Sequence, residues 1–443
     1  MPAVLTEKRV LEIWQNSLQG RTDLLTEDNE SVRIIYPGRL NDDRGADLRD
    51  AVIATRQGLL KGDIEIHRKT SNWWEHGHHR DPVYNRVILH VVFRNDSEKG
   101  IALQNGAKAP TLALHDYIQT DSRSTLLRTI PCHNAFSRRN IGRIAEILDE
   151  AGEQRFLAKA AGFQEAILLK GAGQALYRGI MLALGYSKNK EPMEELADRV
   201  PLKKLETAAL DKAPDIEYLA RCQALLTGAA GLLPSQHGER YPDEEQIGDW
   251  EEKLENIRSN SGEKTGMSAA DWSFFKVRPG NHPVRRLAAM SHLLLRYRKK
   301  GLLAGLEEKL SEAAEDSGSH WLEQALLIAP DSYWSRFLDF GVPASGMVPA
   351  LLGKERAAEI IINVLLPFRF ARGPAERSEE AMGIYREYGA PAENTLVKHM
   401  RKQLGISKQL VASARRQQGL IHIYKTLCSQ GKCGKCPVNT GSS

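Results

Sequence analysis

The chain has 443 residues, of which 42% are hydrophobic and 26% are charged, with a formal net charge of +5. This composition excludes an intrinsically disordered protein, and the length exceeds one ordinary hydrophobic core, so two or three domains are expected. The small net charge permits a local basic patch but does not by itself indicate nucleic-acid binding.

The first 120 residues are expected to form a mixed α/β domain. An amphipathic helix is predicted from about Thr6. Five strands are predicted to follow, at 32–36, 50–55, 62–67, 86–93 and 111–117. The segment QGLLKG is interpreted as a hairpin-like connection before the third strand. The fourth strand, RVILHVVF, is apolar on both faces, which is typical of a central strand.

Helical periodicity replaces the strand pattern from about residue 120 onward. Polar stretches at 234–246 and 258–266 separate a middle helical segment from a C-terminal one. Three regions are therefore expected: an α/β domain (1–120), a helical middle region (121–235) and a helical C-terminal region (236–443). The predicted fold class is α+β, with a mixed sheet followed by a large all-helical region.

Neither a membrane span nor a secretory signal is predicted. No apolar run reaches the roughly 18–20 residues that cross a bilayer. The N-terminal sequence MPAVLTEKRVLEIW has charges where a signal peptide needs its apolar segment. The five cysteines, three of them in the last sixteen residues, do not form the pattern of a secreted disulfide-bonded protein. A cytoplasmic protein is expected.

The third predicted strand, GDIEIH, places three polar side chains on one face. Side chains alternate along a strand, so Asp63, Glu65 and His67 share the face opposite the two isoleucines. This face is either solvated or a site, and its place beside a central strand favours a site. Asp47, or Asp50, at the preceding strand would add a carboxylate. Two carboxylates and an imidazole at one end of a sheet suit Mg²⁺ or Mn²⁺.

The segment WWEHGHHRDPVY follows this strand and is rich in metal-ligand residue types. His76, His78 and Asp81 would contact phosphate or complete the same metal site. The alternative is a surface loop whose polar side chains cap the local backbone. His90, in the predicted central strand, is interpreted either as a hydrogen-bonded core residue or as a further ligand.

The C-terminal segment LCSQGKCGKCPV contains a second candidate metal site. Three soft ligands lie within nine residues: Cys428, Cys433 and Cys436. The C-x4-C-x2-C spacing, followed by proline, suits an iron–sulfur cluster, and zinc is nearly as suitable. A fourth ligand is needed, with Cys132 as the first choice, then His133, then Cys222. The alternative is three free thiols on a frayed tail.

Several motifs resemble those of a family of uncharacterised bacterial proteins that form a domain of unknown function. They are GDIEIH, W-x-H-x-H-H-x-D-x-x-Y, VILHVV, LYRGIMLALGYSKNK (176–190), RPGNHPVRRLA (278–288), NVLLPF (363–368) and the terminal C-x4-C-x2-C-P. These motifs span nearly the whole chain. The resemblance implies membership of that family and names no activity.

The order of predicted elements also resembles the core of PD-(D/E)xK nucleases, which reads helix, three strands, helix, strand. That core has an acidic residue at the start of its second strand and Glu-x-Lys on its third. Asp47 or Asp50, and Glu65-x-His67, occupy the matching positions, with His67 in place of the lysine. The resemblance implies a restriction-endonuclease-like core. Some of these nucleases have a four-cysteine cluster that links distant segments, which makes such a link conceivable here.

The function expected from these patterns is metal-assisted phosphodiester hydrolysis of DNA or RNA. Asp47 and Glu65 would hold the metal, and His67 would orient or deprotonate water, since imidazole titrates near neutral pH. The loop residues would assist: His76, His78 and Asp81.

Basic residues in the helical regions are candidates for phosphate contacts, among them Arg278, Arg285 and Arg286 around PGNHP. Two other functions stay open. One is a non-catalytic module that binds nucleic acid or protein, and the other is a metal-dependent hydrolase of a small phosphorylated or amide substrate. A nuclease needs a groove with basic rims, whereas a small-molecule hydrolase needs a closed pocket.

Overall fold

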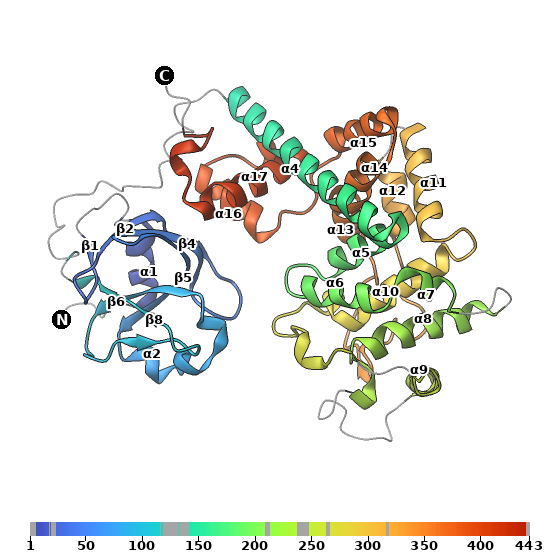
Figure 1. Cartoon of the computed structure of the whole chain (residues 1–443), viewed down its shortest axis with the longest axis horizontal. Helices are drawn as coiled ribbons and strands as arrows, with labels where there is room; N and C mark the ends of the chain where they lie inside the picture. The colour runs from blue at the N-terminus through green and yellow to red at the C-terminus, as the bar shows by residue number, and fades with distance from the viewer. Residues whose placement is uncertain are drawn as a thin grey trace. The chain divides into compact units, whose positions relative to one another are not determined.

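The computed structural model describes residues 6–16, 18, 24–115, 117, 132, 141–208, 213–236, 248–262, 266–315 and 319–439. Its contacts divide the chain into two compact units (Figure 1). The first, here called the sheet unit, comprises Met1–Gln154, Glu393–Ala412 and Arg416–Ser443. The second, the helical unit, comprises Arg155–Ala392 and Ser413–Arg415. The boundaries expected near residues 120 and 235 stay predictions.

The sheet unit is built on a seven-stranded mixed sheet in the order β1-β2-β4-β5-β6-β9, with β3 paired to β4. Its strands are β1 (Leu24–Leu25), β2 (Ser31–Tyr36), β3 (Arg39–Leu40), β4 (Leu48–Thr55), β5 (Gly58–Lys69), β6 (Val87–Arg94) and β9 (Thr111–Ala113), beside a small ladder of β7 (Ile101–Ala102) and β8 (Lys108–Ala109). Its helices are α1 (Glu7–Asn16), α2 (Asn72–Glu75), α16 (Thr395–Leu404) and most of α17 (Ala414–Thr426). Helix α4 (Ile141–Lys170) carries the chain into the helical unit.

Strand directions follow from the connections. Strands β2, β4 and β5 form an antiparallel meander, whereas β6 pairs in parallel with β5 and β9 pairs in parallel with β6. Parallel pairing requires a crossover, which α2 and two short 3-10 turns provide. The predicted hairpin-like link is present, because β4 and β5 pair antiparallel up to Thr55 and Gly58. The connection is shorter than QGLLKG, since β5 already begins at Gly58.

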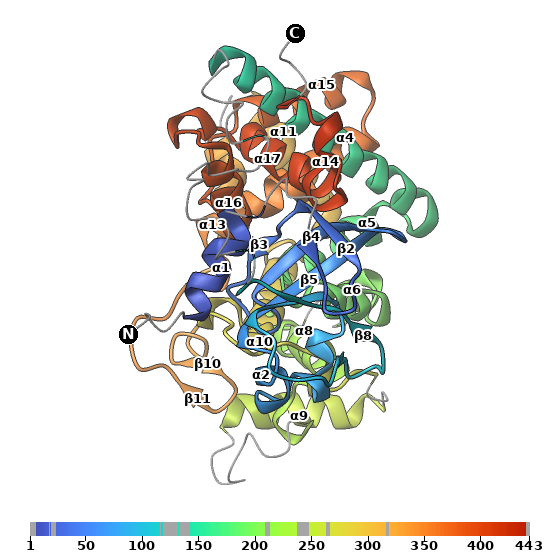
Figure 2. The ribbon, with the colours of Figure 1, turned by 90° about the vertical axis from the view of Figure 1, so that its left-hand side faces the viewer.

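One face of this sheet is covered by α1 (Figure 2). Val10 and Trp14 of the helix share a buried cluster with Ile64 and Ile66 of β5, and the indole N–H of Trp14 donates to the carbonyl of Pro37 at 3.0 Å. Since side chains alternate along β5, the residues between these isoleucines point to the opposite face. Strand β5 therefore packs with one apolar face and one polar face, as predicted for GDIEIH.

The helical unit is formed almost wholly by helices around one large apolar core. They are α5 (Ala172–Leu184), α6 (Lys190–Arg199), α7 (Leu202–Glu206), α8 (Asp215–Ala229), α9 (Asp249–Asn260), α10 (Pro283–Arg296), α11 (Leu302–Glu315), α12 (Ser319–Leu326), α13 (Lys354–Ile360), α14 (Leu366–Arg372) and α15 (Ala375–Glu387), with a π-helical turn at Ile361–Leu365 and a hairpin of β10 (Phe337–Asp339) and β11 (Val342–Pro343). The α+β class, with a mixed sheet followed by a mainly helical region, is confirmed. None of the helices in the described part of the chain combines the length and apolar character of a bilayer span.

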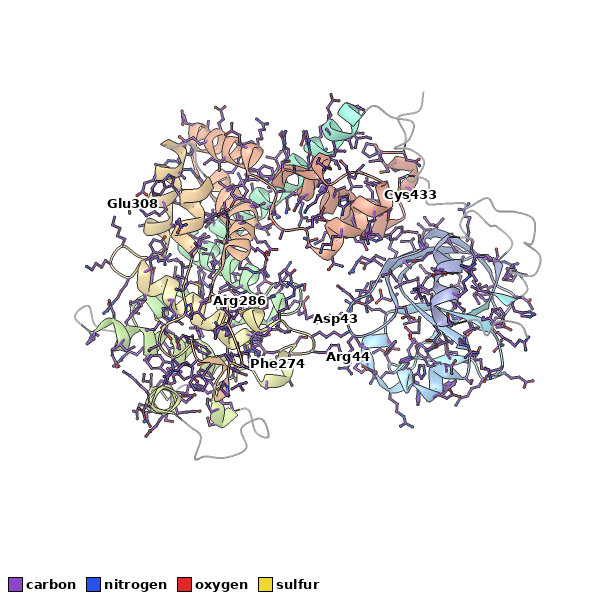
Figure 3. All side chains as sticks on the ribbon, turned by 180° about the vertical axis from the view of Figure 1, so that it is seen from behind. Asp43, Arg44, Phe274, Arg286, Glu308 and Cys433 are labelled. Atoms are coloured by element: carbon purple, nitrogen blue, oxygen red, sulfur yellow. The ribbon has the colours of Figure 1, made fainter. Side chains whose placement is uncertain are left out.

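The interpretation of Arg285 and Arg286 as phosphate contacts is wrong. Both side chains are buried in the helical unit, where Figure 3 shows Arg286 among the helices. The guanidinium of Arg285 donates to the carbonyl oxygens of Trp334 and Pro349, at 3.0 and 2.7 Å. That of Arg286 donates to the carbonyl of Leu351 at 2.7 Å. These arginines satisfy buried backbone acceptors and face no ligand.

Candidate metal centre

Three histidines of the sheet unit converge on one point beside β5, and the carboxylate of Glu65 lies next to two of them. Glu65 and His67 come from the strand, and His76 and His78 come from the crossover that follows it. Nε2 of His67 lies 3.1 Å from Nδ1 of His76 and 3.5 Å from Oε1 of Glu65. That same carboxylate oxygen lies 3.2 Å from Nε2 of His78. One nitrogen from each of the three histidines lies within 4.8 Å of the others.

These separations fit a single metal ion. In a tetrahedral site with metal–ligand distances of about 2.0–2.1 Å, neighbouring ligand atoms are about 3.3 Å apart. The distances of 3.1, 3.2 and 3.5 Å lie on either side of that value. The buried Nε2 of His78 has no hydrogen-bond partner among the described residues, because Glu65 does not lie along its N–H direction. A shared cation would satisfy both groups.

The local sequence explains how the loop histidines reach the strand. Helix α2 ends at His76, and Gly77 adopts a left-handed conformation (φ +75°), which turns the chain into the next 3-10 turn at His78. The buried Trp73 lies edge-on to the His78 ring, with ring centroids 5.3 Å apart. Tyr84 lies 3.9 Å from the same ring, between centroids, and the ring of His67 stacks on it at 5.2 Å. The imidazole of His78 is thus packed among aromatic rings.

His90 of β6 orients the central histidine. It pairs with Glu65 across the parallel ladder, and its Nε2 lies 2.9 Å from Nδ1 of His67. If Nδ1 of His67 carries the proton and donates it to His90, Nε2 of His67 presents its lone pair to the metal point. Such support of a metal-ligating histidine by a second residue is usual in metal sites.

Asp47 positions the carboxylate from the start of β4. Its backbone N–H donates to Oε2 of Glu65 at 3.1 Å, and its own Oδ2 accepts the backbone N–H of Ile66 at 3.0 Å. Asp47 and Glu65 are thereby brought together as the sequence pattern predicts, but the described geometry places Asp47 as the support of Glu65. The metal point itself is formed by the three histidines, with Glu65 beside His67 and His78.

The electrostatics of the centre favour a bound cation. Burial raises the pKa of Glu65 to about 8, and burial together with Glu65 raises the pKa of Asp47 to about 7. Burial and the neighbouring His90 lower the pKa of His67 to about 2, and burial lowers that of His90 to about 3. The imidazole of His67 is therefore neutral and able to bind metal, and a cation would stabilise the carboxylates in their charged form.

Asp81 has a structural role in the described geometry. Its Oδ1 accepts the backbone N–H of Val83 at 3.0 Å, and its Oδ2 lies 2.7 Å from the guanidinium of Arg44. This is the local capping that is the alternative interpretation of the loop. Asp81 is not in the group of converging ligand atoms.

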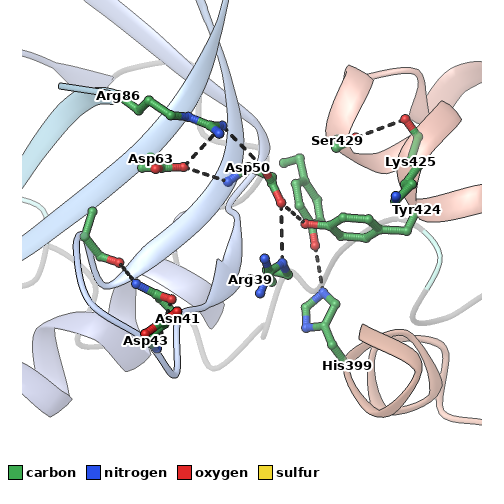
Figure 4. Close-up of polar contacts among 12 residues, drawn as sticks. Arg39, Asn41, Asp43, Asp50, Asp63, Arg86, His399, Tyr424, Lys425 and Ser429 are labelled. Atoms are coloured by element: carbon green, nitrogen blue, oxygen red, sulfur yellow. Dashed lines mark hydrogen bonds and ion pairs between the residues drawn. The ribbon is translucent and has the colours of Figure 1, made fainter. Parts of the chain in front are cut away.

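Asp50 and Asp63 form a separate polar network (Figure 4). The backbone N–H of Asp50 donates to Oδ1 of Asp63 at 3.1 Å, and Arg86 lies 3.6 Å from the same oxygen. The Asp50 carboxylate accepts the hydroxyl of Tyr424 at 2.8 Å and lies 3.4 Å from Nε of Arg39. Of the two candidates for the preceding strand, Asp47 therefore belongs to the metal centre and Asp50 does not.

Glu7 of α1 contributes to the centre although no sequence motif singles it out. Its charge adds to the rise in the pKa of both Glu65 and Asp47, after the larger effect of burial. The available signal is its place in the first turn of a helix that packs on β5. From the sequence alone, that acidic residue is indistinguishable from the usual charged start of a helix.

The predicted cysteine site is also gathered within the sheet unit. Cys132, Cys428, Cys433 and Cys436 line one cavity. His133 lies outside the described residues. Cys222 is buried in α8 of the helical unit, where its thiol lies 3.7 Å from the carbonyl of Leu205. Cys132, the first choice of fourth ligand, is therefore the residue that lines this cavity together with the three C-terminal cysteines.

Comparison with known proteins gives a family but no activity. No curated protein and no solved structure matches the chain. A family model described as "Protein of unknown function (DUF2851)" matches residues 7–392. Glu65, His67, His76 and His78 lie inside the matched span, whereas the three C-terminal cysteines lie beyond it. The expected membership of an uncharacterised family is confirmed: the chain belongs to the DUF2851 family of proteins of unknown function.

Proposed function

We propose that the sheet unit is a metal-dependent phosphodiesterase that cleaves nucleic acid. The observation that carries this proposal is the convergence of His67, His76 and His78, with one nitrogen of each within 4.8 Å of the others, beside the Glu65 carboxylate, which lies 3.5 Å from His67 and 3.2 Å from His78. A metal ion held there would lower the pKa of a bound water and stabilise charge on a phosphate oxygen. The side chain of His76 is exposed at this point, so a large substrate could approach from solvent.

The donor set narrows the choice of ion. Three imidazole nitrogens and one carboxylate oxygen suit Zn²⁺ or Mn²⁺ better than Mg²⁺, which prefers oxygen ligands and retains its waters. Of the two ions expected from the sequence, Mn²⁺ is a better candidate than Mg²⁺. Zn²⁺ is an additional candidate.

The order of elements supports a nuclease over other metal-dependent hydrolases. Helix α1 precedes the meander β2-β4-β5, and α2 leads to β6, which is parallel to β5. Asp47 stands at the start of β4, and Glu65-x-His67 lies on β5. This order and these positions are similar to those of the PD-(D/E)xK nuclease core, apart from the two short strands β1 and β3. An analogy of fold does not establish activity, so the proposal depends on the site.

The side chains have distinct roles in this proposal. His67 is a ligand and not a free base, because Nε2 faces the metal point and Nδ1 faces His90. Asp47, whose backbone N–H donates to Oε2 of Glu65, is then the candidate proton acceptor. The side chains of Arg44 and Arg86 are 62% and 67% exposed and form ion pairs with Asp81 and Asp50. Both guanidinium groups can contact phosphate from solvent.

The test is hydrolysis of single- and double-stranded DNA and RNA by metal-free protein supplied with Mn²⁺, Zn²⁺ or Mg²⁺. We expect Glu65→Gln to lower the rate at least about 100-fold, as removal of a group acting on developing charge does. His79→Asn is the matched control, because His79 belongs to the same loop but packs on Trp74, with ring centroids 4.6 Å apart. Equal rates for wild type and Glu65→Gln on every substrate would contradict the proposal.

A second function follows if Glu65, which lies beside His67 and His78, joins the three histidines as a fourth ligand. Four protein ligands around one ion are typical of structural zinc sites, which keep no open position. In that case the sheet unit is a metal-stabilised binding module. Replacement with Co²⁺ distinguishes the two, because inorganic phosphate added to an open site changes the visible spectrum of the bound ion and leaves that of a closed site unchanged.

A further inference from the structure

Four of the five cysteines meet in one cavity of the sheet unit. Its lining consists of Cys132, Cys428, Cys433, Cys436, Gln403, Leu427 and Asn439. None of the cysteines forms a disulfide. Cys132, Cys428 and Cys436 are buried, and Cys433, labelled in Figure 3, is half-buried. Four unoxidised thiols of two distant segments are thus held together away from solvent.

Two short turns bring three of these cysteines to the cavity from one short segment. Cys428–Gln430 and Cys433–Lys435 are 3-10 turns. Gly431 joins them in a left-handed conformation (φ +68°), and its N–H donates to the carbonyl of Cys428 at 3.0 Å. The amide of Asn439 donates to the carbonyl of Cys433 at 3.2 Å. The backbone is therefore satisfied internally, which leaves the sulfur atoms for the cavity.

One amide donates to sulfur atoms from both segments. Nε2 of Gln403, on α16, donates to Sγ of Cys132 at 3.6 Å and to Sγ of Cys428 at 3.9 Å. The other wall is apolar and continues into a buried cluster that includes Val52 and Leu420. An apolar cavity with N–H donors aimed at sulfur is the environment in which thiolate-bound clusters are stabilised.

The spacing of the sulfur atoms distinguishes a single ion from a cluster. Around one zinc ion, with Zn–S distances of about 2.3 Å, sulfur atoms lie about 3.8 Å apart. The group of described residues that could hold a single ion consists of the three histidines of the metal centre and does not include these four cysteines. In a cubane cluster each iron takes one cysteine, so the sulfur ligands stand farther apart.

We propose that Cys132, Cys428, Cys433 and Cys436 bind a [4Fe–4S] cluster. This inference does not depend on the proposed hydrolase, because no ligand is shared with the metal centre. The cluster would join the C-terminal segment to the sheet, which the segment already contacts. Nζ of Lys61 donates to Oε1 of Gln430 at 2.7 Å, and Tyr424 donates to Asp50 at 2.8 Å, as Figure 4 shows.

The test begins with the wild-type chain purified without oxygen. We expect about four iron atoms and four acid-labile sulfides per chain, a broad visible absorption that bleaches with dithionite, and an electron paramagnetic resonance signal of the reduced cluster. Cys132→Ser and Cys433→Ser should each reduce the iron to less than one atom per chain. Cys222→Ser is the matched control, a buried cysteine outside the cavity, and should keep the full iron content.

Each alternative result overturns the proposal. One zinc and no iron per wild-type chain would assign a zinc site, and wild type without iron or zinc would show four free thiols. Full iron content in Cys132→Ser would exclude Cys132 as a ligand. Because these wild-type measurements need no variant, they decide the matter even if the serine variants fail to fold. If the wild-type protein contained the cluster but hydrolysed no substrate, the proposed function would be contradicted and this inference would still hold.

Discussion

Metal affinity at the histidine centre should depend steeply on pH through one carboxyl group. Burial raises the pKa of Glu65 to about 8, so a proton must leave before the carboxylate can bind a cation. About half of the groups are ionised at pH 8 and about one in a hundred at pH 6. The conditional affinity should therefore fall about 50-fold from pH 8 to pH 6, or about 2 kcal/mol, from Glu65 alone.

Glu65→Gln isolates this contribution. The variant keeps a side chain of the same size but removes the titrating group, so its affinity should be weaker throughout and its pH dependence flatter by that 50-fold factor. The assay is competition for Zn²⁺ or Mn²⁺ with a chromophoric chelator at pH 6, 7 and 8. Titration in buffers of different ionisation enthalpy should also show that wild type releases about one more proton than the variant at pH 7.

The same shift should affect the metal-free protein. A carboxyl group whose pKa is higher in the folded state binds more protons there than in the unfolded state. The free energy of unfolding should then fall as pH rises from about 4 to about 8, and less so in Glu65→Gln. If wild type and Glu65→Gln show parallel pH profiles in both affinity and stability, the titrating group is not Glu65 and this explanation is wrong.

Three further substitutions test neighbouring parts of the sheet unit. His90→Gln should weaken metal binding about 10–100-fold, because it removes the partner that orients His67. The control is His79→Asn, and an unchanged affinity in His90→Gln would show that His90 is only a core residue. Cys433→Ser should lower the midpoint of thermal unfolding of the whole sheet unit, since the binding free energy of such a site is also folding free energy, of order 10 kcal/mol in zinc peptides. If the variant lost its metal but kept the same midpoint, the site would stabilise only its own segment. Gly431→Ala should destabilise the protein by about 1–3 kcal/mol, because its added Cβ would meet Val52 Cγ1 at 2.8 Å in a left-handed backbone; Gly434→Ala, where a Cβ meets nothing within 4 Å, is its control.

Strand alternation is the strongest guide to the site. The period of two along GDIEIH predicts that Glu65 and His67 share one face, and the fold places them there. The same rule cannot place His76 and His78. Their positions depend on the left-handed Gly77 and on the burial of Trp73, which are decided by packing and not by a repeat.

The wrong predictions have equally local causes. The pattern around Arg285 and Arg286 misleads because a charge pattern does not reveal that backbone carbonyls of distant turns will converge on it. The connection at QGLLKG is predicted too long because its leucines sit between glycines, although Leu59 and Leu60 pair across the sheet with β4. Cys132 can be named only as the first of three choices, since the sequence carries no signal of which distant residue the C-terminal segment meets.

The division of the sheet unit along the chain has a consequence for biosynthesis. Strands β2 and β4 are translated early, but α16 and the C-terminal turns, which share a buried cluster with Tyr36 and Val52, are translated after most of the helical unit. Between them the ribosome must add the roughly 240 residues of the helical unit, which takes about 10–50 seconds at ordinary elongation rates. During that interval the nascent sheet exposes an apolar surface that invites chaperone binding. Any cofactor that requires Cys132 together with Cys436 can be inserted only after Cys436 has left the ribosome, so its delivery must follow the synthesis of the helical unit.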